Sequence, residues 1–309
     1  MKKLIVIVGP NASGKSELAV RLAKKFSARG GSAFGGNGAE IISADSRQVY
    51  KGLDIGSGKI TKKEMQGIPH HLLDIASPKR IFTVAQYQKL ALKAIKNIWQ
   101  REKLPIICGG TGFYVQAVVD GLIIPEIKPD LKLRKKLEKK STEELFNLLK
   151  RKDQRRAKEI DRHNKRRLIR ALEIVEAIGR VPKLKTEPLR AEISIIGIKK
   201  SRSALKKLIH RRLIKRLKMG LLKEVGKLHR QGLSWQRLEN FGLEYRFGAQ
   251  LLQGKLTEKE FIAKLENAIY QYAKRQMTWF KRDKRIKWLE NKNQAENQTE
   301  KLVLNFLSK

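Results

Sequence analysis

The chain has 309 residues, 41% of them hydrophobic, so it is long enough for about two globular domains and too apolar for a disordered segment. Its 69 Lys and Arg against 30 Asp and Glu give a formal net charge of +39. That excess predicts a nucleic acid as partner, with general basicity as the alternative. No apolar run approaches the ~18 residues of a spanning helix, so we expect no membrane partner.

The lone cysteine, Cys108, excludes an intrachain disulfide and favours a reducing, cytoplasmic location. Because it ends an apolar stretch, we interpret it as a small buried residue rather than a nucleophile. Of the five histidines, His70 and His71 are adjacent, and none shows the spacing of metal ligands. The sequence therefore predicts neither a disulfide framework nor a zinc site.

Residues 4–8 form the first predicted strand, and a glycine-rich turn follows it directly. The turn fits the phosphate-cradling pattern G-x-x-x-x-G-K-[S/T] and consists of Gly9, Pro10, Asn11, Ala12, Ser13, Gly14, Lys15 and Ser16. In such a P-loop, backbone N–H groups converge on phosphate oxygens, the lysine adds a charge, and the hydroxyl can bind Mg²⁺. A plain structural turn between strand and helix is the alternative.

A helix from Ser16 to about Phe26 is expected next, then a loop over 27–39 with five glycines, and a second strand over 40–43. Asp45 follows that strand, beside the P-loop, where open α/β sheets place their ligands. It fits three roles: a general base, an organiser of a magnesium ion, or a helix cap.

Thr83 is predicted to cap a helix through Trp99, and residues 104–108 form a third strand. The run 109–114 (GGTGFY) is a second glycine turn after a strand, in which Thr111 offers a hydroxyl. Its glycines favour close approach of the backbone to a ligand, or mark an ordinary strand-to-helix turn.

The chain then leaves the core near Pro125 and returns near residue 190 to a fourth strand over 193–198. Between them Ser141 and Glu144 fit a capping box, and residues 155–178 predict one helix that ends at Gly179. Its run 164–172 (NKRRLIRAL) is a basic strip suited to phosphates, or a solvated charged face.

Helices are expected over 202–231, over 235–253, and from Thr257 to about Arg282. The tail that follows is expected to be polar with a final apolar turn. The run 272–281 (YAKRQMTWFK) interleaves cations with aromatic residues, which indicates nucleic-acid stacking or core packing. The sequence thus predicts an α/β fold: a P-loop NTPase-like parallel sheet core with an inserted, mostly helical domain and C-terminal helices. We expect the core over 1–124 and 191–290, the inserted domain over 125–190 and the tail over 291–309.

Several segments together resemble the bacterial tRNA dimethylallyltransferases (isopentenylpyrophosphate:tRNA transferases) over about residues 3–290. They are the P-loop, 43–50 (SADSRQVY), 53–59 (LDIGSGK), 67–74 (GIPHHLLD), 109–114, 166–172, 273–276 (AKRQ) and 278–280 (TWF). The resemblance implies transfer of a dimethylallyl group from its diphosphate to N6 of the adenosine 3′ of the anticodon, with Mg²⁺ as cofactor. Lys15, Ser16 and the P-loop would hold the diphosphate, and Asp45 would accept the proton. The tRNA-binding residues it implies are Asp45, Ser46, Arg47, Gln48, Thr111, Arg134, Asn164, Lys165, Arg166, Arg167, Leu168 and Arg170.

The chain departs from the family in three places. Ser16 stands where the family has Thr and retains the metal-binding hydroxyl. Leu208 falls on an arginine that is thought to bind the diphosphate, for which Lys207, Arg211 or Arg212 could substitute. The glycine-rich stretch 30–38 has the character of an insertion.

Three alternatives stay open: an enzyme that prenylates free adenine nucleotides, a P-loop small-molecule kinase that uses ATP, and a tRNA-binding protein without catalysis. The strongly basic C-terminal part argues against the first. We expect a monomer.

Overall fold

The computed structural model describes residues 2–28, 38–290 and 292–308, so the expected glycine-rich insertion lies outside the described residues apart from Gly38. The chain divides into two compact units: Met1–Gly121 with Pro188–Lys309, and Leu122–Glu187. The sequence placed these boundaries at 125 and 190.

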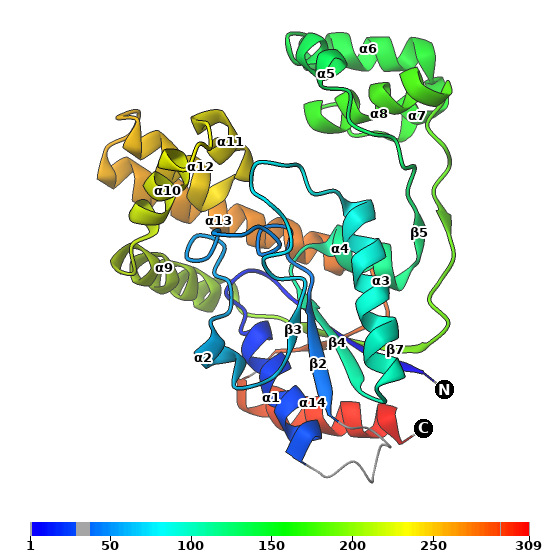
Figure 1. The fold of residues 1–309 in the computed structure, drawn as a ribbon, viewed down its shortest axis with the longest axis vertical. Coiled ribbons are helices and arrows are strands. Elements are labelled where there is room, and N and C mark those ends of the chain that lie inside the picture. The colour runs from blue at the N-terminus through cyan, green and yellow to red at the C-terminus, as the bar shows by residue number, and fades with distance from the viewer. Residues whose placement is uncertain (1, 29–37, 291, 309) are drawn as a thin grey trace. The chain divides into compact units, whose positions relative to one another are not determined.

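The first unit is built on a six-stranded parallel sheet in the order β3-β2-β4-β1-β7-β8 (Figure 1). Its strands are β1 (Lys3–Val8), β2 (Ala39–Ser43), β3 (His70–His71), β4 (Leu104–Gly109), β7 (Glu192–Ile198) and β8 (Ile286–Leu289). Four of them confirm predicted strands, and their near-continuous apolar runs are typical of strands buried on both faces. The sequence analysis missed β3 and β8, which are short and carry no apolar run.

The register brings the carboxyl ends of three strands together. Val8 pairs with Gly109, and Ser43 pairs with Cys108. Because parallel strands end at one edge of the sheet, the P-loop after β1, the Asp45 loop after β2 and the glycine turn after β4 meet there.

Helices cover both faces of the sheet (Figure 1). α1 (Lys15–Ala28) and α14 (Lys292–Leu307) share one apolar cluster with Ile5 and Ile7. The opposite face carries α3 (Val84–Gln100), α4 (Gly112–Val119) and the helices within residues 202–280. Their apolar side chains form one cluster with Leu4, Val6 and Val8. The expected final apolar turn of the tail lies in α14, which buries Val303 completely against the core.

Two helices predicted in the C-terminal part are wrong, because each is divided into two helices in the structure. The expected helix over 202–231 breaks at Gly220 into α9 (Arg202–Lys218) and α10 (Leu221–Arg230). The expected helix over 235–253 breaks at Gly242 into α11 (Trp235–Phe241) and α12 (Leu243–Leu252). Both glycines have a positive φ, 97° and 76°, which L-residues rarely adopt.

Capping explains where the remaining helices of this unit begin. Thr257 forms a capping box with Glu260 and starts α13 (Glu258–Phe280), and Thr83 does the same with Gln86 at α3, which confirms both predictions. The short α2 (Lys62–Met65) also has a capping box. None of the helices in the described ranges is both long enough and apolar enough to cross a membrane.

The second unit contains α5 (Leu131–Glu138), α6 (Thr142–Lys152), α7 (Gln154–Glu159), α8 (Lys165–Ile178) and a two-stranded sheet of β5 (Leu122–Ile123) and β6 (Lys185–Thr186). Ser141 forms the predicted capping box with Glu144. The single helix expected over 155–178 is wrong, because the chain turns over residues 160–164 and Asn164 caps a new helix, α8.

Candidate active site

The P-loop presents unpaired backbone donors at the first turn of α1. Among the described residues, no group accepts a hydrogen bond from the N–H of Gly14, Lys15 or Ser16. Gly14 has a φ of 92°, which lets the chain turn so that these donors follow one another. Consecutive free amides at a helix N-terminus bind anions, so this turn suits a phosphate group.

Cations surround this turn. Lys15 donates to the carbonyl of Pro10 at 3.1 Å. Burial is the largest cause that lowers the pKa of Lys15, and the nearby charges of Arg212 and Arg216 lower it further, whereas Cys108 and Asp45 act in the opposite direction. Three like charges held at close range in a partly desolvated place favour the arrival of an anion.

The two arginines differ in what they contact. Arg216 is buried, donates to Glu244 at 2.5 Å and reaches the carbonyl of Gly56 at 3.3 Å. For the Arg212 guanidinium, no hydrogen bond or ion pair is found with the part of the chain that the structure describes. Burial lowers the pKa of Arg212 to about 10, and Arg216 acts in the same direction. Arg212 is therefore the cation that an incoming phosphate can engage.

Of the three residues that the sequence offered as substitutes for Leu208, Arg212 is the one that lies beside Lys15. Leu208 packs against the apolar core. Lys207 and Arg211 are exposed on α9, and neither is among the charges that influence Lys15. Arg212 is one helical turn beyond Leu208 on α9, so the two side chains lie on the same face of the helix.

The loop over residues 53–59, in which Gly58 lies against these two arginines, is held by one carboxylate. Glu224 accepts hydrogen bonds from the N–H groups of Asp54, Ile55 and Gly56 at 2.7–3.1 Å, and from the hydroxyl of Tyr245 at 2.9 Å. The motif 53–59 therefore shapes the wall of the cation cluster. The sequence analysis missed Glu224, Glu244 and Arg216, because their partners lie more than 20 residues away in the chain.

Asp45 stands opposite, half-buried at the end of β2. Its Oδ1 accepts the N–H groups of Arg47 at 2.8 Å and Gln48 at 3.4 Å, whereas no described residue donates to Oδ2. The Ser46 N–H donates to the hydroxyl oxygen of Thr111 at 3.0 Å, and the Thr111 N–H donates to the carbonyl of Ala44 at 3.1 Å. One carboxylate oxygen is thus fixed and the other is available to accept a proton.

Three tyrosines lie close enough to this carboxylate to feel its charge. Burial is the largest cause that raises the pKa of Tyr87, Tyr114 and Tyr272, and the charge of Asp45 raises it further in each case. The pKa of Tyr272 is raised to about 12, although its hydrogen bond with Thr111 acts in the opposite direction. Tyr87 and Tyr114 stack with ring centroids 3.9 Å apart. The phenols therefore stay neutral at physiological pH and line the neighbourhood of Asp45 with apolar surface.

The glycines of the second turn are explained by protein contacts rather than by a ligand. A Cβ at Gly109 would lie 2.2 Å from the carbonyl oxygen of Ala44, and one at Gly112 would lie 2.2 Å from the ring of Trp279. A Cβ at Gly110 would lie 2.3 Å from the amide nitrogen of Gln276. The turn is pressed between β2 and α13, which fixes Thr111 beside Asp45.

The side chains of two residues implied in tRNA binding form hydrogen bonds within the protein. Arg47 donates to the carbonyl of Phe241 at 2.7 Å. Gln48 donates to the carbonyl of Gly58 at 3.2 Å and accepts from Ser43 at 3.3 Å. Both anchor the Asp45 loop.

The remaining residues implied in tRNA binding belong to the second unit. Asn164 caps α8, Arg166 and Arg167 are exposed on its first turn, and Lys165 donates to the carbonyl of Glu138. Arg134 and Arg170 pair with the buried Glu173, at 2.6 Å and 3.1 Å. The side chain of Leu168, also implied in tRNA binding, is fully buried in this unit's apolar core.

The residues fit a magnesium ion that arrives with a diphosphate. Within the described ranges, no group of three or more His, Cys, Asp or Glu side chains could hold a metal by itself. Ser16 is exposed at the start of α1, so its hydroxyl is accessible. Mg²⁺ is commonly held by one or two protein oxygens together with substrate phosphates and water, and Ser16 suits that pattern.

Cys108 is not a competing nucleophile. The thiol is buried, and burial raises its pKa to about 11 against smaller opposing effects of Lys15 and Ser16. It is therefore protonated at physiological pH, which confirms its interpretation as a packing residue.

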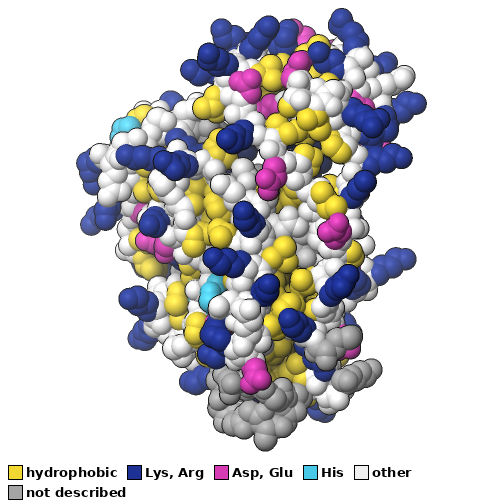
Figure 2. Space-filling view, turned by 45° about the vertical axis from the view of Figure 1, so that its right-hand side comes forward, with side chains coloured by type: hydrophobic (Ala, Val, Ile, Leu, Met, Phe, Trp, Pro, Cys, Tyr) yellow, Lys and Arg dark blue, Asp and Glu magenta, His cyan; other side chains and the backbone are white. Residues whose placement is uncertain are grey.

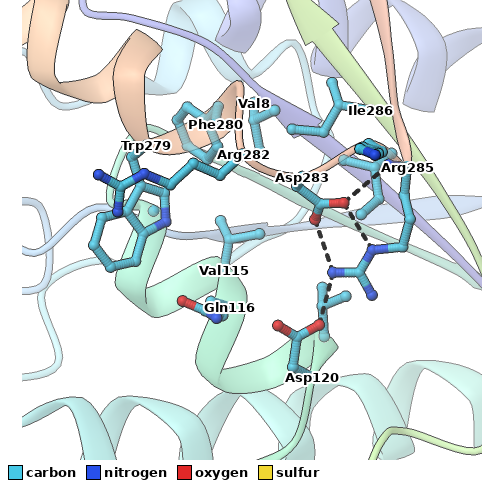
Figure 3. Close-up of a pocket in the computed structure, with 14 residues that line it drawn as sticks. Val8, Val115, Gln116, Asp120, Trp279, Phe280, Arg282, Asp283, Arg285 and Ile286 are labelled. Atoms are coloured by element: carbon cyan, nitrogen blue, oxygen red, sulfur yellow. Dashed lines mark hydrogen bonds and ion pairs between the residues drawn. The ribbon is translucent and has the colours of Figure 1, made fainter. Parts of the chain in front are cut away.

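A cavity of about 330 Å³ borders the second glycine turn, between α4 and the end of α13 (Figure 3). Val8, Val115 and Phe280 contribute apolar walls. Arg285 bridges the carboxylates of Asp120 and Asp283 on its polar side, at 2.7 Å each, as Figure 3 shows. Both carboxylates are therefore held by the same guanidinium.

Lys and Arg side chains are spread over the face of the molecule that Figure 2 shows, with fewer Asp and Glu between them. They accord with the net charge of +39. A surface of this kind attracts polyanions at long range.

The fold and the site define a class: a P-loop α/β protein whose phosphate turn faces a carboxylate. The family model described as IPP transferase matches residues 48–283, and the chain belongs to this family.

Curated relatives agree over nearly the whole length. The chain is 42% identical over 289 residues to "tRNA dimethylallyltransferase 2" of Treponema denticola, covering 90% of this chain and 91% of that one. It is 41% identical over 298 residues to "tRNA dimethylallyltransferase 1" of Syntrophus aciditrophicus, covering 94% of each.

Solved structures are similar as well. The full-length tRNA isopentenylpyrophosphate transferase of Bacillus halodurans matches with a TM-score of 0.73 and 34% identity, covering 99% of this chain and 97% of that one. A eukaryotic dimethylallyltransferase acting on tRNA matches with a TM-score of 0.77 at 24% identity, which shows the shared fold.

Proposed function

We propose that the protein transfers a dimethylallyl group from dimethylallyl diphosphate to N6 of the adenosine 3′ of the anticodon in tRNA. The observation that carries this proposal is the pairing of a free carboxylate oxygen with a phosphate-binding turn. Oδ2 of Asp45 accepts a hydrogen bond from no described residue. Beside it, the N–H groups of Gly14, Lys15 and Ser16 in the P-loop have no acceptor within the same ranges. This arrangement supplies an anion site and a proton acceptor for one reaction. The names of the relatives supply the substrate class.

In this reaction the amine nitrogen attacks the first carbon of the allyl group while the carbon–oxygen bond to the diphosphate breaks. The proton of the amine passes to Oδ2 of Asp45, and diphosphate leaves. The N–H groups of Gly14, Lys15 and Ser16, with the side chains of Lys15 and Arg212, bind the negative charge that grows on the leaving group. Mg²⁺, held through Ser16, would neutralise part of that charge.

The acceptor adenine must leave its stack to reach Asp45, because the carboxylate is half-buried in the loop after β2. Thr111, fixed by Ser46 and bonded to Tyr272, lies where it can contact the flipped base. The exposed cations Arg166 and Arg167 of α8 would bind tRNA phosphates. We further propose that the protein works as a cytoplasmic monomer.

The kinase alternative uses the same loop but predicts a different product. Incubation of the purified protein with unmodified tRNA, Mg²⁺ and dimethylallyl diphosphate should yield prenylated adenosine and diphosphate without ATP consumption. AMP should be a poor acceptor in competition with tRNA. Transfer to AMP in preference to tRNA, or phosphate transfer from ATP, would replace this proposal by one of the alternatives.

A further inference from the structure

Gln276 bridges the two turns that the proposed reaction brings together. Its carboxamide oxygen accepts the N–H of Asn11 in the P-loop at 2.7 Å. Its carboxamide nitrogen donates to the carbonyl of Gly110 in the second glycine turn at 2.8 Å. Gln276 is separated from these two partners by 265 and 166 positions in the chain.

The orientation of this amide is fixed by its partners. A backbone N–H can only donate and a carbonyl can only accept, so a flipped amide would lose both bonds. Gln276 is 7% exposed, and a polar group buried to that degree is costly unless it is hydrogen-bonded. Both bonds of Gln276 are therefore made within the folded protein, and the bond to Gly110 is buried.

Each turn leads to one side of the reaction. On the donor side, Asn11 lies in the P-loop, which continues to Lys15. On the acceptor side, Gly110 precedes Thr111, whose hydroxyl is bonded to the N–H of Ser46, directly after Asp45.

We propose that Gln276 is a positioning residue, which sets the spacing between the diphosphate loop and the acceptor turn. The inference rests on the proposed function and adds a residue that touches neither substrate. Transfer rates depend steeply on such spacing, since a displacement of about 1 Å can cost roughly 100-fold in rate.

The glycine at position 110 supports this assignment. A Cβ there would lie 2.3 Å from the Gln276 nitrogen, closer than real contacts allow. Gly110→Ala should therefore displace the amide and break the bridge from the other end, while the new Cβ would lie 3.4 Å from the carbonyl oxygen of Gly9 in the P-loop.

The first test compares Gln276→Leu with Gln271→Leu. Gln271 is exposed on the same helix and bonds Asn267 of that helix, at 3.5 Å, so it is a matched control. We expect Gln276→Leu to lower kcat about 10- to 100-fold, with KM for both substrates changed less than about threefold. Wild-type kcat, or a loss confined to KM, would overturn the inference.

A second variant keeps the size of the side chain in case Gln276→Leu folds poorly. In Gln276→Glu the ionised carboxylate still accepts from Asn11 but cannot donate to Gly110, whereas the protonated carboxyl can do both. The ratio of its kcat to that of wild type should therefore rise as the pH falls from about 8.5 to 5.5. A ratio independent of pH would contradict a bridging role.

A third test is the double variant Gly110→Ala with Gln276→Ala. If both positions act through one bridge, the double variant should resemble Gln276→Ala alone, because the space for the new methyl group is then free. Losses that multiply would mean that the two positions act independently.

Hydrogen exchange separates this inference from the proposed function. In Gln276→Leu, the N–H of Asn11 should exchange at least about tenfold faster than in wild type. Unchanged exchange would reject the bridge whether or not the protein transfers a prenyl group. Faster exchange in a protein without transferase activity would reject the proposed function alone.

Discussion

Asp45 combines a structural and a chemical task in one carboxylate. Oδ1 closes a turn onto the N–H groups of Arg47 and Gln48, and Oδ2 is free of donors among the described residues. Asp45→Asn retains the turn and removes the proton acceptor. We expect kcat to fall about 100- to 10,000-fold, while Kd for tRNA changes less than about threefold.

Asp54→Asn is the matched control, since it removes only a half-exposed ion pair with Lys59. Turnover assays and filter binding measure the two quantities. If Asp45→Asn lost tRNA binding in proportion to its rate, Asp45 would be a binding residue and the assignment as general base would be wrong.

Arg212 carries a separate prediction about the donor. Because it lies beside Lys15 without a protein partner within the described ranges, Arg212→Met should raise KM for dimethylallyl diphosphate about tenfold or more. KM for tRNA should not follow. Arg211→Met, on the exposed side of α9, should leave KM for the donor unchanged, and equal effects of the two variants would contradict this role for Arg212.

At the scale of elements, glycines decide where the C-terminal helices begin and end. Gly242 separates α11 from α12 with φ 76° and ψ −179°, a conformation reserved for glycine. Gly226 lies inside α10, where an added Cβ would meet no atom closer than 3.4 Å. Gly242→Ala should destabilise the protein by about 1–3 kcal/mol, and Gly226→Ala should stabilise it by about 0.5–1 kcal/mol.

Urea unfolding measures both changes in the free energy of unfolding. Equal signs for the two variants would mean that backbone conformation is not what divides α11 from α12. The pair also separates strain from crowding, since no described atom lies within 4 Å of the new Cβ at position 242.

A buried carboxylate joins β2 to its neighbours. Glu40 is 2% exposed at its side chain and pairs with Arg101 at 2.5 Å, Lys103 at 2.9 Å and His71 at 2.7 Å. The hydrogen bond with Arg101, as the largest cause, lowers the pKa of Glu40 from 4.5 to about 2.

A carboxyl with a lowered pKa stabilises the fold above its ordinary value and loses that contribution as the pH falls through the folded value. Glu40→Gln should therefore cost roughly 3 kcal/mol at pH 7, and the difference from wild type should shrink between about pH 4.5 and 2. Unfolding free energies measured at pH 7 and pH 3 test this. A difference that stayed constant with pH would show that the charge of Glu40 does not contribute.

The same elements show what could be predicted from sequence. Apolar runs identified four strands. Thr83 as an N-cap, and the spacing of Ser141 and Thr257 from their Glu partners, gave three helix starts. The helical periodicity of hydrophobic residues continues across Gly220 and Gly242. It therefore predicted one helix on each occasion where the structure has two. Those breaks are decided by φ, which a hydrophobic pattern does not report.

The candidate site divides in the same way. The P-loop, Asp45 and Thr111 stand in local motifs and could be found from sequence. The bridge of Gln276 and the ion pair of Arg216 with Glu244 join residues far apart in the chain, so no local pattern indicates them. Arg170 forms an ion pair with the buried Glu173, which could not be predicted from the charged run of α8.

At the scale of the whole molecule, charge governs the encounter with RNA. A net charge of +39 predicts strong dependence of tRNA affinity on salt. Replacement of the exposed Arg166 by Ala should weaken binding and reduce the slope of log K against log salt by about 1, with kcat at saturation unchanged. A slope unaffected by Arg166→Ala would exclude a phosphate contact at this position.

The central claim is that one site joins a diphosphate clamp to a proton acceptor for prenyl transfer to tRNA. The most direct measurement is a single-turnover assay with purified protein, unmodified tRNA, Mg²⁺ and dimethylallyl diphosphate, with wild type and Asp45→Asn in parallel. We predict one prenylated adenosine, 3′ of the anticodon, for each diphosphate released by wild type, and almost none by the variant. No prenylated product on any cognate tRNA, or equal rates for the two proteins, would contradict the account.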